Sequence, residues 1–111
     1  MDKDINVWLY DILKSVKEIE SFFGDKPKIF NEFTNDIKTK RAVERELEII
    51  GEAVSRIMKR DSMIQITNAR KIVDTRNKII HGYDSITDDL IWGIIINHIP
   101  KLREEIESFL K

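Results

Sequence analysis

Residues 37–59 read IKTKRAVERELEIIGEAVSRIMK, and this stretch decides the fold. Its apolar residues recur every three or four positions, which is the spacing of one face of an α-helix. These residues are Val43, Leu47, Ile50, Val54, Ile57 and Met58. Gly51 interrupts the stripe, and so small a residue indicates either close approach by another helix or an exposed face that tolerates it. The stretch therefore predicts a long amphipathic helix.

The segments on either side predict further helices of the same kind. Residues 4–23 carry apolar side chains at helical spacing, and Gly24 is expected to end that helix. Asp25-Lys26-Pro27 is typical of a helix start and predicts a short second helix that packs through Ile29, Phe30 and Phe33. After the long helix, Thr67 or Asn68 is a candidate cap for another helix, which Gly82 is expected to end.

The final helix, expected from about Asp88 to Phe109, carries apolar residues on more than one face. Pro100 removes a backbone donor and predicts a kink near Ile96. The crowded positions are Leu90, Ile91, Trp92, Ile94, Ile95, Ile96 and Ile99. We do not expect one core to use them all, so the pattern indicates a second buried surface. We interpret this surface as a homodimer interface, although a helix central to its own bundle has the same pattern.

The composition restricts the fold, the chemistry and the compartment. A chain of 111 residues with 41% hydrophobic and 35% charged residues predicts one all-α domain, residues 1–111. The chain has no Cys and two His, so we expect no disulfide, no metal and no cofactor. We expect a cytoplasmic protein, because the sequence has neither a membrane span nor an N-terminal signal pattern.

Charge is unevenly spread along the chain, although the formal net charge is only −1. From Lys38 to Lys78, eleven Lys and Arg stand against six Asp and Glu. The middle third therefore predicts a face that attracts phosphate. The alternative is that Lys and Glu side chains merely cover solvated helix surfaces.

Residues 74–83 read DTRNKIIHGY and bring together groups that can cleave RNA without a metal. Such cleavage requires a base for the ribose 2′-hydroxyl, a cation for the charge on the phosphate and an acid for the leaving oxygen. His81 can serve as base or acid, while Arg76 stays charged and offers a planar fork of donors. DNA lacks the 2′-hydroxyl, so it is not expected to be a substrate.

Helix geometry limits how these groups converge. At about 100° per residue, Asn77 and His81 lie roughly 40° apart, so Asn77 can orient the imidazole. Arg76 and His81 lie roughly 140° apart and are not expected to meet on one straight helix. The turn at Gly82 could re-aim the imidazole, or the motif helices of two protomers could meet across a two-fold axis. Such a dimer would place two Arg76 and two His81 side chains in one groove.

The pattern Arg76-Asn77-x-x-x-His81-x-Tyr83 resembles the signature of the HepT-like toxins of the HEPN superfamily. Residues 48–53, EIIGEA, are similar to the preceding helix of these proteins, and Ile99-Pro100-x-Leu102 is similar to their final helix. The resemblance covers nearly the whole chain, while residues 63–70 depart from the family pattern. It implies an antiparallel bundle of about five helices that dimerises, with catalytic Arg76 and His81 lining a shared cleft that cuts RNA.

The resemblance also implies a partner. HepT-like toxins are typically encoded beside a small nucleotidyltransferase antitoxin, which silences them by transferring AMP to the tyrosine of the motif, here Tyr83. An anionic phosphate beside His81 and Arg76 would occupy the place of an RNA phosphate and cancel the local positive charge. The resemblance therefore implies a toxin–antitoxin pair that is switched by modification of Tyr83.

Each motif residue also has a purely structural interpretation. His81-Gly82 is an ordinary helix ending, Arg76 can pair with Glu48 or Glu52, and Tyr83 can cover the end of the bundle. The chain could thus be a metal-independent ribonuclease that leaves a 2′,3′-cyclic phosphate, a non-catalytic module that binds nucleotide or docks a nucleotidyltransferase, or a helical dimerisation domain without a ligand. The joint pattern and the resemblance favour the ribonuclease.

Overall fold

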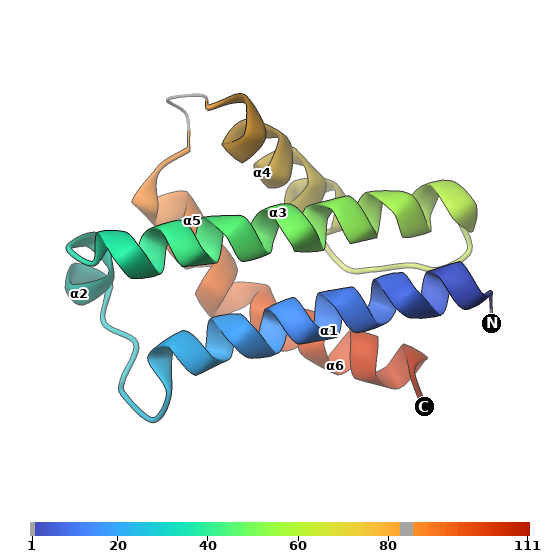
Figure 1. Ribbon diagram of the computed structural model, residues 1–111, viewed down its shortest axis with the longest axis horizontal. Helices are drawn as coiled ribbons and strands as arrows, with labels where there is room; N and C mark the ends of the chain where they lie inside the picture. The colour runs from blue at the N-terminus through green and yellow to red at the C-terminus, as the bar shows by residue number, and fades with distance from the viewer. Residues whose placement is uncertain (1, 83–85) are drawn as a thin grey trace.

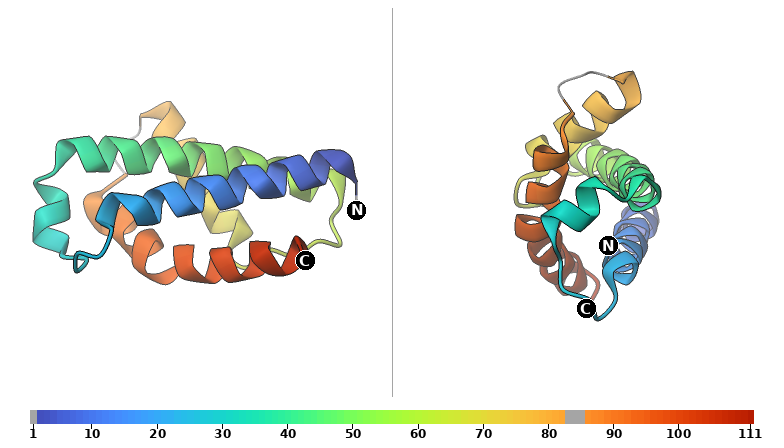
Figure 2. Two further views of the ribbon diagram at one scale, coloured as in Figure 1. Left: turned by 60° about the horizontal axis from the view of Figure 1, so that its bottom comes forward. Right: turned by 90° about the vertical axis from the view of Figure 1, so that its left-hand side faces the viewer.

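The computed structural model describes residues 2–82 and 86–111, which form six helices. They are α1 (Lys3–Phe23), α2 (Phe30–Thr34), α3 (Ile37–Arg60), α4 (Ala69–His81), α5 (Asp88–Asn97) and α6 (Ile99–Phe109). Helices α1 and α3 lie side by side and antiparallel (Figures 1 and 2). Helix α6 packs along α1, and α4 packs on the other side of α3. The predicted all-α bundle is confirmed. Within the described ranges, no helix is long and apolar enough to cross a bilayer.

The two long helices begin and end within one residue of the predicted positions, because their limits are set by local contacts. Asp2 caps α1 by accepting the N–H of Asp4 at 2.7 Å, and Asp36 caps α3 by accepting the N–H of Thr39 at 3.1 Å. Gly24 follows α1 with φ 56, a conformation that costs glycine little. These signals can be read from a few neighbouring residues.

The core lies where the apolar faces of α1, α3, α5 and α6 meet. The predicted stripe of α3 is buried at Val43, Leu47, Ile50, Val54 and Ile57. Facing residues from the other three helices include Leu9, Ile12, Ile91, Ile95, Leu102 and Ile106. Burial of each such side chain contributes roughly 1.5–3 kcal/mol, so this seam holds the bundle together.

The second helix begins at Phe30, so the prediction that it starts at Asp25-Lys26-Pro27 is wrong. The N–H of Lys26 donates to the carbonyl oxygen of Phe23 at 3.1 Å, which continues the turn after α1. Ile29 then has an extended backbone with φ −118 and ψ 119. The proline therefore lies in the connection between the two helices.

The predicted final helix is divided in two at His98. Pro100 lies in the first turn of α6 and has no N–H to donate to the carbonyl oxygen of Ile96. The expected kink near Ile96 is therefore a break two residues later, and the described chain has six helices instead of about five.

Most of the apolar excess of α5 is buried inside the same chain, while Ile96 keeps 41% of its surface exposed. Trp92 packs against the rings of Phe23, Phe30 and Phe33, with ring centroids 6.0, 5.8 and 5.2 Å away. Ile91, Ile94 and Ile95 of the same helix are buried in the core. Helix α5 thus buries most of these residues in its own bundle, and the homodimer interface stays a prediction.

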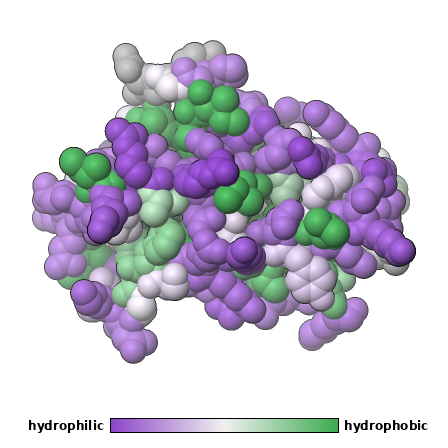
Figure 3. Space-filling view, in the orientation of Figure 1, coloured by the Kyte–Doolittle hydropathy of each residue, from purple (hydrophilic) through white to green (hydrophobic). Residues whose placement is uncertain are grey.

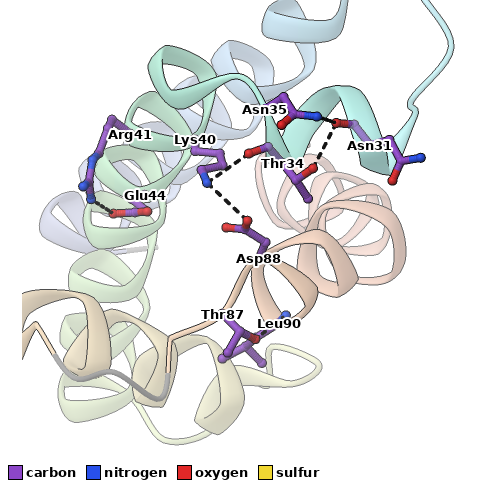
Figure 4. A network of polar contacts seen from close by, with 9 residues as sticks. All are labelled: Asn31, Thr34, Asn35, Lys40, Arg41, Glu44, Thr87, Asp88 and Leu90. Atoms are coloured by element: carbon purple, nitrogen blue, oxygen red, sulfur yellow. Dashed lines mark hydrogen bonds and ion pairs between the residues drawn. The ribbon is translucent and has the colours of Figure 1, made fainter.

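A polar network fixes the start of α5 beside the start of α3 (Figure 4). Lys40 on α3 donates from Nζ to the backbone oxygen of Thr34 and to Asp88 Oδ2, both at 3.2 Å. Thr87 caps α5 by accepting the N–H of Leu90 at 3.2 Å. These bonds anchor the start of α5 where α2 and α3 meet.

Candidate active site

The start of α4 is held against α6 and the break between α5 and α6. Asn68 occupies the predicted cap position with φ 62, but its side chain lies 3.0 Å from His98 Nδ1 and does not cap the helix. Thr67 donates its N–H to Glu105 Oε1 at 3.0 Å and its hydroxyl to Glu105 Oε2. Burial, together with the charge of Lys71, lowers the pKa of His98 and favours its neutral ring.

The end of α4 places His81 at the surface. Gly82 has φ 66 and donates its N–H to the carbonyl oxygen of Ile79 at 3.2 Å, so it ends the helix as predicted. His81 is the last residue of α4, and it is exposed. Tyr83, the predicted site of modification, lies outside the described residues.

Arg76 faces α3, and its guanidinium contacts one side chain of α3 and one of α4. Nη2 donates to Glu52 Oε2, and Nη1 donates to Asn77 Oδ1 at 2.7 Å. The purely structural interpretation of Arg76 predicted an ion pair with Glu48 or Glu52, and the pair with Glu52 is confirmed. Asn77 contacts the guanidinium, while its predicted contact with the imidazole of His81 stays a prediction. Arg76 therefore has a fixed place, with 24% of its side chain exposed.

Gly51 makes this contact between α3 and α4 possible. A β-carbon added at Gly51 would lie 2.3 Å from Cβ and 2.8 Å from Cγ of Arg76. Both distances are too short for real carbon atoms, so any larger residue would push Arg76 away. The predicted close approach at Gly51 is confirmed, and the approaching residue is Arg76 itself.

An open pocket of about 310 Å³ lies beside Arg76, between α1, α3 and α4. Its charged side chains are Asp11, Arg45, Glu48, Glu52, Arg56 and Arg76. Trp8 and Ile80 contribute apolar surface. His81 is not among the described residues that line it, so this pocket of a single chain does not bring the two predicted catalytic residues together.

Part of the positive excess of the middle third is offset by carboxylates from outside it, because Arg60 pairs with Asp2 and Asp4 and Lys40 pairs with Asp88. Four arginines of α3 each contact a carboxylate at 2.7–3.3 Å, in the pairs Arg41–Glu44, Arg45–Glu48, Arg56–Glu52 and Arg60–Asp2. Figure 3 shows that the face formed by α1 and α3 is mainly hydrophilic, with separate hydrophobic spots. The ion pairs make α3 less attractive to phosphate than its sequence indicated.

Most side chains of the pocket were not predicted from the sequence, Arg56 and Trp8 among them. Arg56 follows Glu52 by four residues on the same helix face, and this spacing could have indicated their ion pair. Trp8 comes from α1, and no local pattern marks it. Its place beside Arg76 depends on how α1 and α4 both pack on α3.

The family described as Ribonuclease HepT-like matches residues 12–109, from the middle of α1 to the end of α6. This match covers most of the chain and includes Arg76, Asn77 and His81. The chain belongs to the ribonuclease HepT-like family. The resemblance to HepT-like proteins of the HEPN superfamily is thereby confirmed.

Several relatives of this HepT-like chain align with almost its whole length. Putative RNase MJ0127 from Methanocaldococcus jannaschii is 40% identical over 111 residues, which cover 98% of this chain and 89% of that protein. Putative RNase MJ1380 from the same organism is 38% identical over 95% of both chains. Probable ribonuclease HepT from Thermococcus cleftensis is 32% identical over 94% of both. No solved structure matches the chain.

Proposed function

We propose that this HepT-like chain is a metal-independent endoribonuclease, the toxin of a toxin–antitoxin pair, and that it acts as a homodimer. The observation that carries the proposal is the fixed position of Arg76 at an open pocket, held by Glu52 and Asn77. His81 lies five residues later at the exposed end of the same helix. The relatives named as ribonucleases support the same activity.

The proposed reaction needs only Arg76 and His81. One His81 takes the proton of the ribose 2′-hydroxyl, and the 2′-oxygen attacks the phosphorus. The bond from phosphorus to the 5′-oxygen breaks, and a second His81 gives its proton to that oxygen. Arg76 stabilises the negative charge on the phosphate oxygens. The products are a 2′,3′-cyclic phosphate and a 5′-hydroxyl.

The requirement for two imidazoles is the reason to propose a dimer. Arg76 faces the pocket, whereas His81 lies outside it on the same helix. Ile80 lines the pocket and keeps 52% of its surface exposed, so an apolar side chain is available there for a second copy of the chain. A two-fold axis near the end of α4 would bring two copies of the site into one cleft.

Purified protein incubated with single-stranded RNA tests this function directly. We expect Arg76→Ala and His81→Ala each to lower the cleavage rate by about 100-fold or more. Arg70→Ala removes the same charge from α4 outside this pocket and serves as the matched control. EDTA should not slow the reaction, and DNA of the same sequence should stay intact. Equal cleavage by all four proteins would contradict the proposal.

The proposed partner is a nucleotidyltransferase antitoxin that transfers AMP to Tyr83. The proposal rests on the motif and the family. Coexpression with such an enzyme encoded beside this chain should add mass in steps of one AMP, located on the Tyr83 peptide and accompanied by loss of RNA cleavage. An unmodified Tyr83 peptide in the coexpressed protein would count against this partner.

The second candidate function is a non-catalytic module that binds nucleotide or docks a nucleotidyltransferase. It is favoured by the ion pair between Arg76 and Glu52, because a paired arginine can bind the phosphate of a nucleotide, or contact a partner protein, without catalysis. Titration with ATP and with RNA distinguishes the two functions. Nucleotide binding without any RNA turnover would support the module.

A further inference from the structure

Glu52 holds two arginines at once, and only one of them belongs to the motif. Its Oε1 accepts from Arg56 Nε at 2.9 Å, and its Oε2 accepts from Arg76 Nη2. Arg56 comes from the next turn of α3, whereas Arg76 comes from α4. A single carboxylate therefore connects the helix that carries the motif to the helix on which it packs.

The guanidinium of Arg76 is restrained on several sides. Glu52 takes one hydrogen of Nη2, and Asn77 takes one hydrogen of Nη1 at 2.7 Å. Nε is buried without a hydrogen-bond partner among the described residues, and the stem lies against Gly51. Since a guanidinium has five N–H donors, one hydrogen on each terminal nitrogen is left for an incoming phosphate. The group is thus oriented before any RNA binds.

The charges of the pocket separate two roles that Glu52 could have. Three arginines and three carboxylates line the pocket, so their formal charges cancel. Removing any one carboxylate leaves one positive charge, which by itself strengthens the attraction of phosphate. If Glu52 only neutralises the charge of Arg76, its loss should raise the rate of RNA cleavage. If Glu52 orients Arg76, its loss should make the chemical step slower even though RNA binds at least as well.

We propose that Glu52 is a positioning residue for RNA cleavage, which fixes the guanidinium of Arg76 where negative charge develops on the phosphate. Donors that are already oriented stabilise a transition state without reorganisation during the reaction. Arg56 fixes the second carboxylate oxygen and so restricts the rotation of Glu52. The inference rests on the proposed ribonuclease function and adds a residue outside the motif.

Glu48 offers a matched control for the test. It lies one turn before Glu52 on α3, lines the same pocket and pairs with Arg45 at 3.1 Å. Glu52→Gln and Glu48→Gln therefore remove the same charge from the same pocket, but only the first removes a partner of Arg76. Thermal melting of both variants checks that they are folded.

The experiment measures kcat and KM for RNA cleavage by the wild type, Glu52→Gln, Glu48→Gln and Arg76→Ala. We expect both glutamine variants to lower KM to a similar extent, and Glu52→Gln alone to lower kcat, by about tenfold. Glu48→Gln should keep kcat within about twofold of the wild type. Glu52→Asp keeps the charge but shortens the side chain, so it should not restore kcat.

Two results would overturn the inference while leaving the proposed function intact. The first is an equal kcat for the two glutamine variants, and the second is a higher kcat for Glu52→Gln. In both cases Arg76→Ala would still be inactive. A wild type that does not cleave RNA, or an Arg76→Ala variant as active as the wild type, would instead overturn the proposed function and the inference with it.

Discussion

Helix α3 presents two glutamates to two different neighbours, and the contrast between them separates stability from function. Glu46 is buried in the main bundle, beside Ser15 and Glu18 of α1. Burial, and then a hydrogen bond with Glu18, raises the pKa of Glu46 to about 7. Glu52 faces α4, keeps 40% of its side chain exposed and pairs with two arginines. The same residue type thus destabilises one interface when it is ionised, and it holds Arg76 at the other.

The two interfaces also differ in how firmly they are held. Helix α1 buries six residues, most of them apolar, whereas the described part of α4 buries Ile72 and Thr75. Because apolar burial supplies most of the stabilisation, the contact between α1 and α3 holds the bundle together. The contact between α3 and α4 depends more on Gly51 and on the polar groups around Arg76. Changes there should alter the site more than the fold.

The largest effect is expected at Gly51. Gly51→Ala should lower the free energy of unfolding by about 1–3 kcal/mol, because the new methyl group overlaps the stem of Arg76 and α4 must move. RNA cleavage should fall with it, by about tenfold or more, since Arg76 is displaced. Denaturant unfolding and cleavage assays measure the two losses.

Gly93→Ala is the matched control for this change. Gly93 also lies inside a helix, and a β-carbon added there meets no atom within 4 Å. Alanine should therefore raise the free energy of unfolding by up to about 1 kcal/mol through helix propensity. Equal responses at the two glycines would contradict the close approach of α4 to α3.

An effect on stability alone, which depends on pH, is expected at Glu46. Its pKa in the folded protein, about 7, lies above its ordinary value of 4.5, so the folded state binds this proton more tightly than the unfolded state. Stability from this group is therefore greatest below pH 4.5, falls as the pH rises towards 7 and changes little above that. Glu46→Gln should remove this decline and stabilise the protein at pH 8 by about 1–3 kcal/mol.

The exposed Glu104 on α6 provides the comparison for Glu46. Glu104→Gln removes the same charge without changing the buried contact between α1 and α3. Its unfolding curves between pH 4.5 and 8 should follow those of the wild type. If Glu46→Gln kept the pH dependence of the wild type, the buried carboxyl would not be its source.

The smallest change in stability is expected at Glu52. Its pairs are partly exposed, and pairs of that kind contribute about 0–1 kcal/mol, so Glu52→Gln should change the free energy of unfolding by less than about 1 kcal/mol. The same variant should slow RNA cleavage, as inferred above. A loss of stability as large as that of Gly51→Ala would show that Glu52 is mainly a structural residue.

Most of the helices could be predicted because their signals are local. Apolar spacing defined α1 and α3, and Gly24 and Asp36 set the end of α1 and the start of α3. The errors arose where a local signal has two meanings. Pro27 suits a first helical turn but also a connection, and Pro100 can kink a helix or divide it. The apolar excess of α5 also has two meanings, since apolar residues on two faces occur both in a dimer and in a helix packed inside its own bundle.

The sequence by itself determined the helical class, the family motif with Arg76 and His81, and the candidate chemistry, because these depend on residue types and short spacings. Only the tertiary structure decided which charges meet. Glu52 and Arg76 are 24 residues apart in the chain, and no spacing rule connects them. They meet because Gly51 lets α4 pack against α3, and Asp11 of α1 then completes a pocket in which three arginines face three carboxylates.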